Sequence, residues 1–183
     1  IPIQVGAEGN EKLGYLCDNV GDNISKKNSN YCELTGIYWA WKNLSCDYIG
    51  LCHYRRYFSN GSRSNEIYYK RRSILLEQDY YDLLMKYDVI LPKKRNYYIE
   101  TVRSQYEHGH NKNDLDEVER ILVELYPEYR IAFEKVMNRT SLHIYNMFVM
   151  KKSKFDEYCE WLFKILFELE KRIDITNYDQ YQA

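Results

Sequence analysis

The sequence contains few prolines and none of the short motifs that mark several large enzyme classes. Only three prolines occur in 183 residues. No Walker loop, GxGxxG, GxSxG or HExxH run is present, which excludes the enzyme classes that depend on those motifs. The sequence also lacks a signal peptide and any apolar run of transmembrane length. These absences favour a protein of the cytoplasm.

The cysteines form no CxxC pair and have no metal-ligand spacing. There are five of them, mostly within apolar patterns: Cys17, Cys32, Cys46, Cys52 and Cys159. An odd number in such a context predicts buried free thiols in a reducing compartment. Nucleophilic catalysis by Cys52 and His53 is formally possible but disfavoured, because adjacent strand residues point to opposite faces.

The composition is that of a folded domain. Hydrophobic residues make up 45% and charged residues 29% of the chain, and the formal net charge is -1. Broad nucleic-acid binding is disfavoured, because it requires a strongly basic surface. Twenty tyrosines suit polar, stackable ligands such as sugars, although structural roles account for most of them. We expect a single domain over residues 1–183, and the missing initial methionine indicates a fragment of a longer one.

The stretch Asp47–Phe58 combines a predicted strand with a group of polar side chains. Tyr48–Cys52 reads as a short buried strand, in which Gly50 allows close backbone approach. Four polar residues follow it directly: His53, Tyr54, Arg55 and Arg56. Ligands of open α/β sheets bind beyond the carboxyl ends of strands, and paired arginines suit phosphate. The alternative is a solvated or salt-bridged strand end, and the pattern alone does not decide between the two.

A second predicted strand ends in the same way. Asp88–Pro92 reads as a buried strand, and Lys93, Lys94 and Arg95 come directly after it. Two strands that both end in positive charge make a shared anion site more probable than either would alone.

Helical periodicity and capping patterns account for most of the remaining chain. The expected helices are Tyr31–Asn43 with Asn30 as N-cap, Gln78–Lys86, Asp114–Leu125, one opened by Pro127, and one from Ser153 to about Arg172. His143–Met150 is a further strand candidate, and Asn96–Asn113 is predicted to be a long loop. The alternation favours an α/β layered domain.

The histidines and the paired aspartates are weaker candidates for a metal site. His108 and His110 lack companions at zinc-site spacing, and His143 is expected to be a hydrogen-bonded structural residue. Asp114 and Asp116 have the Asp-x-Asp form that can hold a divalent ion. They lie at a helix start, where acids complement the helix dipole, so we reject them as a metal site.

Asp22 and Asn23 lie in a polar loop and are candidates for hydrogen-bonding a ribose or another sugar. A plain turn is an equally good interpretation, because Asp and Asn favour such turns through their own side chains.

Several stretches together resemble a bacterial family called domain of unknown function 4422. They are Gly21–Ser25, Tyr31–Asn43, Asp47–Phe58, Leu91–Lys94 and Tyr145–Lys151. The Trp-Ala-Trp-Lys-Asn and His-Tyr-Arg-Arg-Tyr-Phe runs are specific, and the resemblance extends over nearly the whole chain. Members of this family are commonly labelled as capsular or exopolysaccharide biosynthesis glycosyltransferases.

The resemblance implies a fold and a reaction. The fold would be a GT-A-like, Rossmann-type mixed α/β sheet flanked by helices, truncated at both ends relative to other members. The reaction would move a sugar from a nucleoside-diphosphate-sugar donor to a lipid-linked or polymeric cell-surface glycan. Its expected location is the cytoplasm, at the inner face of the plasma membrane, with peripheral membrane association. A non-catalytic glycan- or phosphate-binding module is the alternative.

The resemblance also implies residue roles. The catalytic candidates are His53, Arg55, Arg56 and His110; the donor-binding candidates are Asp22, Asn23, Tyr54, Lys93, Lys94 and Asn146; and Tyr106 and His108 are expected on the acceptor side. Arg55 and Arg56 would stabilise the leaving diphosphate, and His53 or His110 would act as general base. We expect no cofactor. A divalent metal is the alternative, although these strand ends carry no acid motif to hold one.

Overall fold

The computed structural model describes residues 1–59, 68–69, 72–176 and 178. The chain divides into two compact units, each built from separated stretches of sequence. The first unit comprises Ile1–Ser45, Tyr97–Thr140 and Asp156–Ala183, and the second comprises Cys46–Asn96 and Ser141–Phe155. The single domain expected from the sequence stays a prediction, and each unit is described here by itself.

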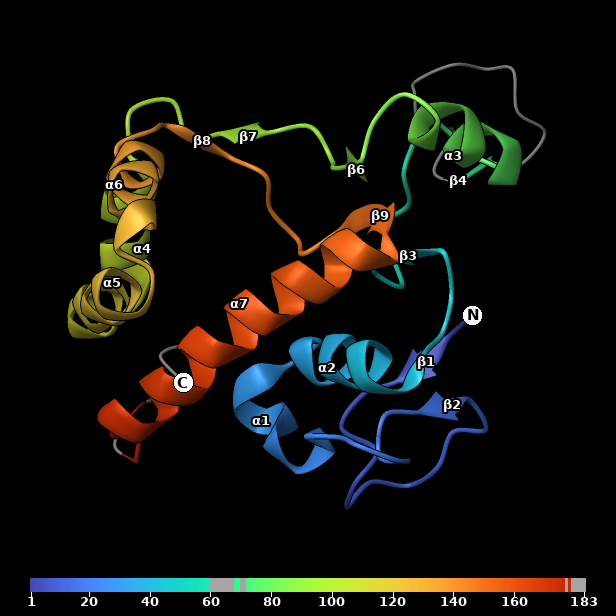
Figure 1. Ribbon diagram of the computed structural model, residues 1–183, viewed down its shortest axis with the longest axis horizontal. Helices are drawn as coiled ribbons and strands as arrows, with labels where there is room; N and C mark the ends of the chain where they lie inside the picture. Colours follow the sequence, from blue (N-terminus) through green and yellow to red (C-terminus); the bar gives the residue numbers. More distant parts are fainter. Residues whose placement is uncertain (60–67, 70–71, 177, 179–183) are drawn as a thin grey trace. The chain divides into compact units, whose positions relative to one another are not determined.

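The first unit is mainly helical. Its elements are β1 (Ile3–Gln4), β2 (Leu16–Cys17), η1 (Ser25–Lys27), α1 (Asn28–Tyr31), α2 (Leu34–Asn43), α4 (Val102–Gly109), α5 (Lys112–Leu125), η2 (Pro127–Tyr129), α6 (Arg130–Met137) and most of α7 (Lys152–Arg172). Strands β1 and β2 pair in parallel, and α7 is the longest helix among the described residues (Figure 1).

The second unit is built on small antiparallel sheets. Its elements are β3 (Tyr48–Leu51), β4 (Tyr68–Tyr69), β5 (Arg72–Ser73), α3 (Glu77–Leu84), β6 (Val89–Ile90), β7 (Arg95–Asn96), β8 (Ser141–Leu142) and β9 (Phe148–Lys151). The central sheet has the order β3-β9-β6 (Figure 1). With the parallel β1–β2 pair and the flanking helices, this confirms the expected mixed α/β class.

Helix α7 organises the core of the first unit. The ring of Trp41 on α2 stacks on Phe163 of α7 with centroids 5.9 Å apart, and Tyr38 meets Phe163 edge-on at 5.0 Å. On α5, Ile121 and Leu122 form a buried cluster with Ile165 of α7. Aromatic and aliphatic burial of this kind supplies most of a fold's stabilisation.

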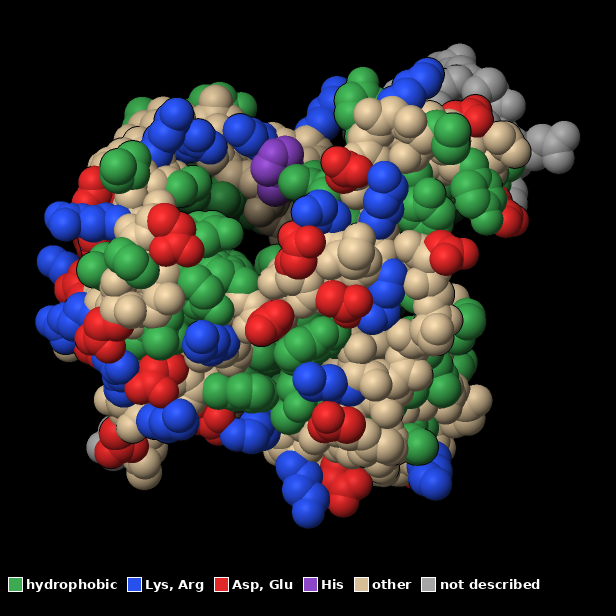
Figure 2. All heavy atoms as spheres, viewed as in Figure 1, with side chains coloured by type: hydrophobic (Ala, Val, Ile, Leu, Met, Phe, Trp, Pro, Cys, Tyr) green, Lys and Arg blue, Asp and Glu red, His purple; other side chains and the backbone are tan. Residues whose placement is uncertain are grey.

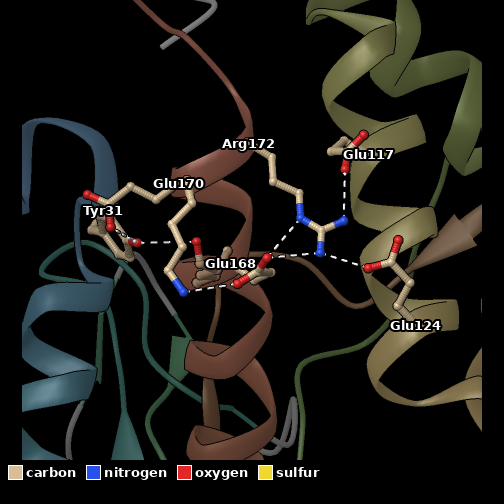
Figure 3. Close-up of polar contacts among 8 residues, drawn as sticks. Tyr31, Glu117, Glu124, Glu168, Glu170 and Arg172 are labelled. Carbon is tan, nitrogen blue, oxygen red and sulfur yellow. Dashed lines mark hydrogen bonds and ion pairs between the residues drawn. The ribbon is translucent and has the colours of Figure 1, made fainter.

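Charged side chains tie the end of α7 to its neighbours. Arg172 pairs with Glu117 at 3.2 Å and with Glu124 at 2.7 Å, both on α5 (Figure 3). Glu170 accepts hydrogen bonds from Lys27 and from the Tyr31 hydroxyl (Figure 3). These contacts fix the carboxyl-terminal turns of α7 against α5 and α1.

Two helix predictions need correction. The predicted helix Tyr31–Asn43 is interrupted at Cys32, whose φ is 46°, and Asn30 lies inside α1 and is not its N-cap. The Asn28 side chain donates a 2.7 Å hydrogen bond to the Cys32 carbonyl, so the break is stabilised locally. The predicted loop Asn96–Asn113 contains α4, which is capped by Thr101. Its apolar pattern is too weak to reveal it, since Val102 is its one buried residue.

The predicted burial of the two strands is also wrong. In β3, Tyr48, Ile49 and Leu51 are half-buried and Gly50 is exposed. Around β6, Val89 is 38% exposed and Leu91 45%. Both strands are edges of a three-stranded sheet, so each has only one neighbour to cover it.

The cysteines are free, as expected, but mostly not buried. Cys32, Cys46 and Cys52 are exposed and only Cys159 is buried. Cys32 lies at the helix break and Cys46 in the connection before β3, so both lie outside regular secondary structure.

The surface carries both signs of charge. On the face shown in Figure 2, lysine and arginine side chains alternate with aspartate and glutamate, consistent with the net charge of -1. Among the described residues, no helix has both the length and the apolar composition needed to cross a membrane.

A buried carboxylate holds the amino-terminal segment together. The fully buried Asp18 accepts four hydrogen bonds, from the Gly6 and Ala7 amides and the Ser25 and Thr35 hydroxyls. Burial raises the pKa of this carboxyl, but these bonds lower it, and the net shift is below the ordinary 3.8. The bonds therefore favour the ionised form.

We predict that Asp18→Asn lowers the free energy of unfolding at pH 7 by about 3 kcal/mol, because an amide nitrogen cannot accept these hydrogen bonds. Because the folded pKa lies below the unfolded value, this stabilisation is present above about pH 4 and is lost as the pH falls through the folded pKa. Urea unfolding of both proteins between pH 7 and pH 2 measures the difference.

The matched control is Asp47→Asn, which changes an exposed side chain and should alter stability by less than about 0.5 kcal/mol. Equal stability of Asp18→Asn and the parent protein at pH 7 would contradict the prediction.

Candidate functional site

The pairing of the central sheet brings three segments of the second unit together at one end of its strands. This end, where β3 and β6 stop and β9 begins, is called the cationic edge. Strand β9 is antiparallel to both β3 and β6, so the carboxyl ends of β3 and β6 lie where β9 begins. Leu51 is opposite Phe148 and Ile90 is opposite Val149. The two cationic strand ends predicted from the sequence therefore meet at the same edge, next to Tyr145 and Asn146.

Side chains from several segments at this edge contact Tyr145. The guanidinium carbon of Arg56 lies 4.0 Å from the centre of its ring. Arg95 Nη1 lies 3.4 Å from its hydroxyl oxygen, and His53 Nε2 donates a 2.8 Å hydrogen bond to its carbonyl oxygen. One residue thus contacts side chains from both strand ends.

The backbone at this point is strained. Tyr145 has φ 81° and Asn146 has φ 50°, a left-handed conformation that is uncommon for a residue as bulky as tyrosine. Each such residue costs about 1–3 kcal/mol and persists only where its surroundings enforce it. Strain at a convergence of cations is typical of functional sites.

Buried neighbours enforce this conformation. Met147, which follows Asn146, packs with Phe58 and Leu75 in a buried cluster. The Leu75 amide also donates a 3.0 Å hydrogen bond to the Phe58 carbonyl. Because Met147 and Phe58 are anchored together, the segments just before them, which carry Tyr145 and Arg56, are held near each other.

Short hydrogen-bonded connections position the remaining cations. The Arg56 amide donates to the His53 carbonyl at 3.1 Å, which makes residues 53–56 a tight turn. At its corner, Arg55 stacks on the Tyr54 ring at 4.6 Å. Arg56 therefore faces the shared edge, whereas Arg55 rests on its own neighbour.

Contacts with the segment before β9 hold the chain that follows β6. His143 Nδ1 donates a 2.5 Å hydrogen bond to the Pro92 carbonyl, as expected for a structural histidine. Arg95 in β7 is paired with Leu142 in β8. The exposed Lys93 and Lys94 are carried by the short connection between these two fixed points.

These cations have no acidic partners in the part of the chain that the structure describes. Several arginines elsewhere are paired: Arg103 with Asp116 and Glu119, Arg120 with Glu117, Arg130 with Glu134, and Arg172 with three glutamates. No such ion pair is found among the described residues for Arg55, Arg56, Lys93, Lys94 or Arg95. This favours an anion site over the salt-bridged alternative.

The other site candidates belong to the first unit. The Tyr38 hydroxyl and the Asn43 side chain bond to Asp22, and Asn23 Oδ1 accepts from the Ser25 amide at 3.2 Å. The last contact is an Asx turn, the simpler of the two readings. The donor-binding role of both residues stays a prediction.

Three further candidates lie on or next to α4. Tyr106 and His110 have ring centres 4.8 Å apart, and His108 Nδ1 lies 2.6 Å from a Glu100 carboxylate oxygen. His108 and His110 are not brought together with a third ligand, since no described group of three His, Cys, Asp or Glu side chains is arranged to hold a metal ion.

Two residues of the edge were not among the site candidates predicted from the sequence. Arg95 was recognised as a strand-end cation, and its position beside Lys93 and Lys94 was the available signal. Tyr145 precedes a strand in the run Tyr-Asn-Met-Phe-Val-Met-Lys. Nothing in that run reveals the left-handed turn that places Tyr145 at the centre.

Residues 1–183 match the model of the family described as Domain of unknown function (DUF4422). The apo structure of the WbbM bifunctional glycosyltransferase matches 98% of this chain with a TM-score of 0.84 and 34% sequence identity. The chain spans 35% of the length of that protein. No curated protein sequence matches the chain.

We predict that Arg56→Ala and Arg95→Ala each weaken the binding of inorganic pyrophosphate about tenfold, the value of one lost charge-assisted hydrogen bond. Titration calorimetry at two salt concentrations measures this, and binding should weaken at the higher one because the cations are exposed. Arg130→Ala, which removes a paired arginine of the first unit, should leave binding unchanged. Unaltered binding in both edge variants would contradict an anion site.

Substitutions of Tyr145 distinguish the contribution of its ring to binding from the effect of its backbone conformation on stability. Tyr145→Phe keeps the ring under Arg56 and should change pyrophosphate affinity less than Tyr145→Ala, which removes both arginine contacts. Tyr145→Gly should be more stable than Tyr145→Ala by about 1 kcal/mol, because glycine adopts positive φ without strain. Thermal unfolding measures the stability difference, and a more stable alanine variant would disprove the strain.

Proposed function

Because the chain belongs to the DUF4422 family, we propose that it is a glycosyltransferase that moves a sugar from a nucleoside-diphosphate-sugar donor to a cell-surface glycan. The name of WbbM, a bifunctional glycosyltransferase, supports the general activity. A lipid-linked or polymeric bacterial glycan, such as a capsular polysaccharide or exopolysaccharide, is the proposed acceptor.

The observation that carries this proposal is the convergence on Tyr145 of Arg56 and Arg95, neither of which has an acidic partner among the described residues. When a glycosyl bond to a diphosphate breaks, negative charge develops on the leaving oxygen atoms. Fixed cations placed at that position lower the barrier, because they are already oriented when the charge appears. Guanidinium groups can also donate two parallel hydrogen bonds to phosphate oxygens.

The remaining proposed roles rest on the family resemblance. Lys93, Lys94 and Arg55 would add positive charge around the diphosphate, and Tyr54 and Asn146 would contact the donor. His53 or His110 is the proposed general base. Asp22 and Asn23 stay candidates for the donor, and Tyr106 and His108 for the acceptor.

The donor set of the edge does not fit a divalent cation. The side chains that meet there are guanidinium, imidazole and phenol groups, whereas magnesium and manganese prefer carboxylate oxygens. We therefore propose a metal-independent reaction in which the arginines supply the positive charge. The proposed location is the cytoplasm at the inner face of the plasma membrane.

Release of nucleoside diphosphate from UDP- and dTDP-sugars by the full-length protein, with a bacterial glycan-lipid fraction as acceptor, tests this function. We expect release that is insensitive to EDTA. Arg56→Ala should lower kcat/KM about 100-fold, the typical loss when one transition-state donor is removed. Arg56→Lys should recover part of it, because lysine supplies charge without the forked geometry.

Arg130→Ala is the control and should leave kcat/KM unchanged. Binding of nucleoside diphosphate without release from any sugar nucleotide would favour the non-catalytic binding module. Loss of activity in EDTA would overturn metal independence alone.

A further inference from the structure

The first unit contains a cavity of about 250 Å³ whose chemistry differs from that of the cationic edge. It lies between α1, α2, α4, α5 and α7 and the segment that follows α7. Its lining residues are Asn30, Tyr31, Leu34, Tyr106, Asp114, Leu166, Leu169, Glu170, Ile173, Ile175 and Tyr178. Its volume is below that of a typical drug-binding pocket, so it suits a ligand about as large as one sugar ring.

Asp114 supplies a buried hydrogen-bond acceptor. Only 8% of this residue is exposed, and its Oδ1 accepts a 2.7 Å hydrogen bond from the Tyr178 hydroxyl. Asn111 in turn donates to that hydroxyl at 2.6 Å. Within the described chain, no residue donates to Asp114 Oδ2. A carboxylate oxygen held in this way is a ready acceptor for a ligand hydroxyl.

Tyr106 supplies a ring and a donor. Burial, and then the charge of Asp114, raise the pKa of its hydroxyl, which therefore keeps its proton at neutral pH. That hydroxyl has no hydrogen-bond partner among the described residues. Tyr106 thus offers a donor and part of an aromatic surface, as amphipathic tyrosines commonly do at polar ligands.

The charge of the cavity disfavours ionic ligands. Asp114 and Glu170 line it and no Lys or Arg is among its described lining residues, so a phosphate would find no cation to bind there. Glu170 is paired with Lys27 at 2.5 Å and accepts a hydrogen bond from the Tyr31 hydroxyl (Figure 3), so Asp114 is the one carboxylate of the described lining left to attract a cation. The leucine and isoleucine side chains complete a wall that is apolar with a few placed polar groups.

We propose that this cavity binds one neutral sugar ring, with Asp114 accepting hydrogen bonds from its hydroxyls and Tyr106 donating one. Identifying that ring as part of the glycan acceptor rests on the proposed function. The binding of a neutral hexose does not.

An amide NMR titration of the whole protein with methyl glucoside and methyl galactoside tests the proposal. At least one should shift resonances of the lining residues. Asp114→Asn should weaken it about tenfold, the loss expected for one hydrogen bond to a charged group. Tyr106→Phe, which keeps the ring, should weaken it less. Asp47→Asn and Arg130→Ala, both outside the lining, should bind like the parent protein.

Several results would contradict a sugar-binding cavity. Absence of hexose binding, or undiminished binding by well-folded Asp114→Asn and Tyr106→Phe, would overturn the proposal. Tenfold tighter binding of protonated glucosamine than of glucose would make the cavity a cation site. Pyrophosphate binding without hexose binding would remove this inference and leave the proposed transferase intact, whereas hexose binding without pyrophosphate binding would do the reverse.

Discussion

The pairing of β9 with both β3 and β6 is the constraint on which the candidate site depends. Because both pairings are antiparallel, the two outer strands run in the same direction and end at one edge. That is the geometric condition under which two separate basic runs become neighbours. The left-handed turn at Tyr145 and Asn146 then directs the chain into β9. Without this turn, the ring that contacts Arg56 and Arg95 would not lie between the two strand ends.

Several cations close together repel one another, which lowers stability unless other contacts offset it. The arginine side chains of the edge are exposed, so water and salt screen their mutual repulsion. Arg55 and Arg56 each lie over an aromatic ring, which is worth about 0.5–1 kcal/mol at exposed sites. This contact uses the flat face of the guanidinium and leaves its N–H edge for a ligand. In the first unit, by contrast, Arg172 uses its donors on three glutamates and serves the fold.

The sequence predicted what local patterns determine. The helices carried by Leu115 to Leu125 and by Phe155 to Leu169 were found because apolar residues recur at helical spacing. The strand ends at His53 and Lys93 were found because charge follows an apolar run. The break at Cys32 and the turn at Tyr145 were missed, because a left-handed conformation at a residue other than glycine depends on tertiary contacts. Strand burial was overestimated because an apolar run does not reveal how many neighbours a strand has.

The two candidate sites match the two substrates of a sugar transfer, because one site suits a charged donor and the other a neutral acceptor. A nucleotide sugar carries its charge on the diphosphate, so its site must supply cations, and Arg56 and Arg95 do so. A sugar acceptor is neutral and rich in hydroxyls, so its site needs hydrogen-bond acceptors together with apolar surface. The cavity at Asp114 and Tyr106 has both. A described lining without lysine or arginine also gives an anionic donor no partner there, and a cationic edge offers no special attraction to a neutral ring. This difference in charge would therefore direct each substrate to its own site before any sugar-specific contact is made.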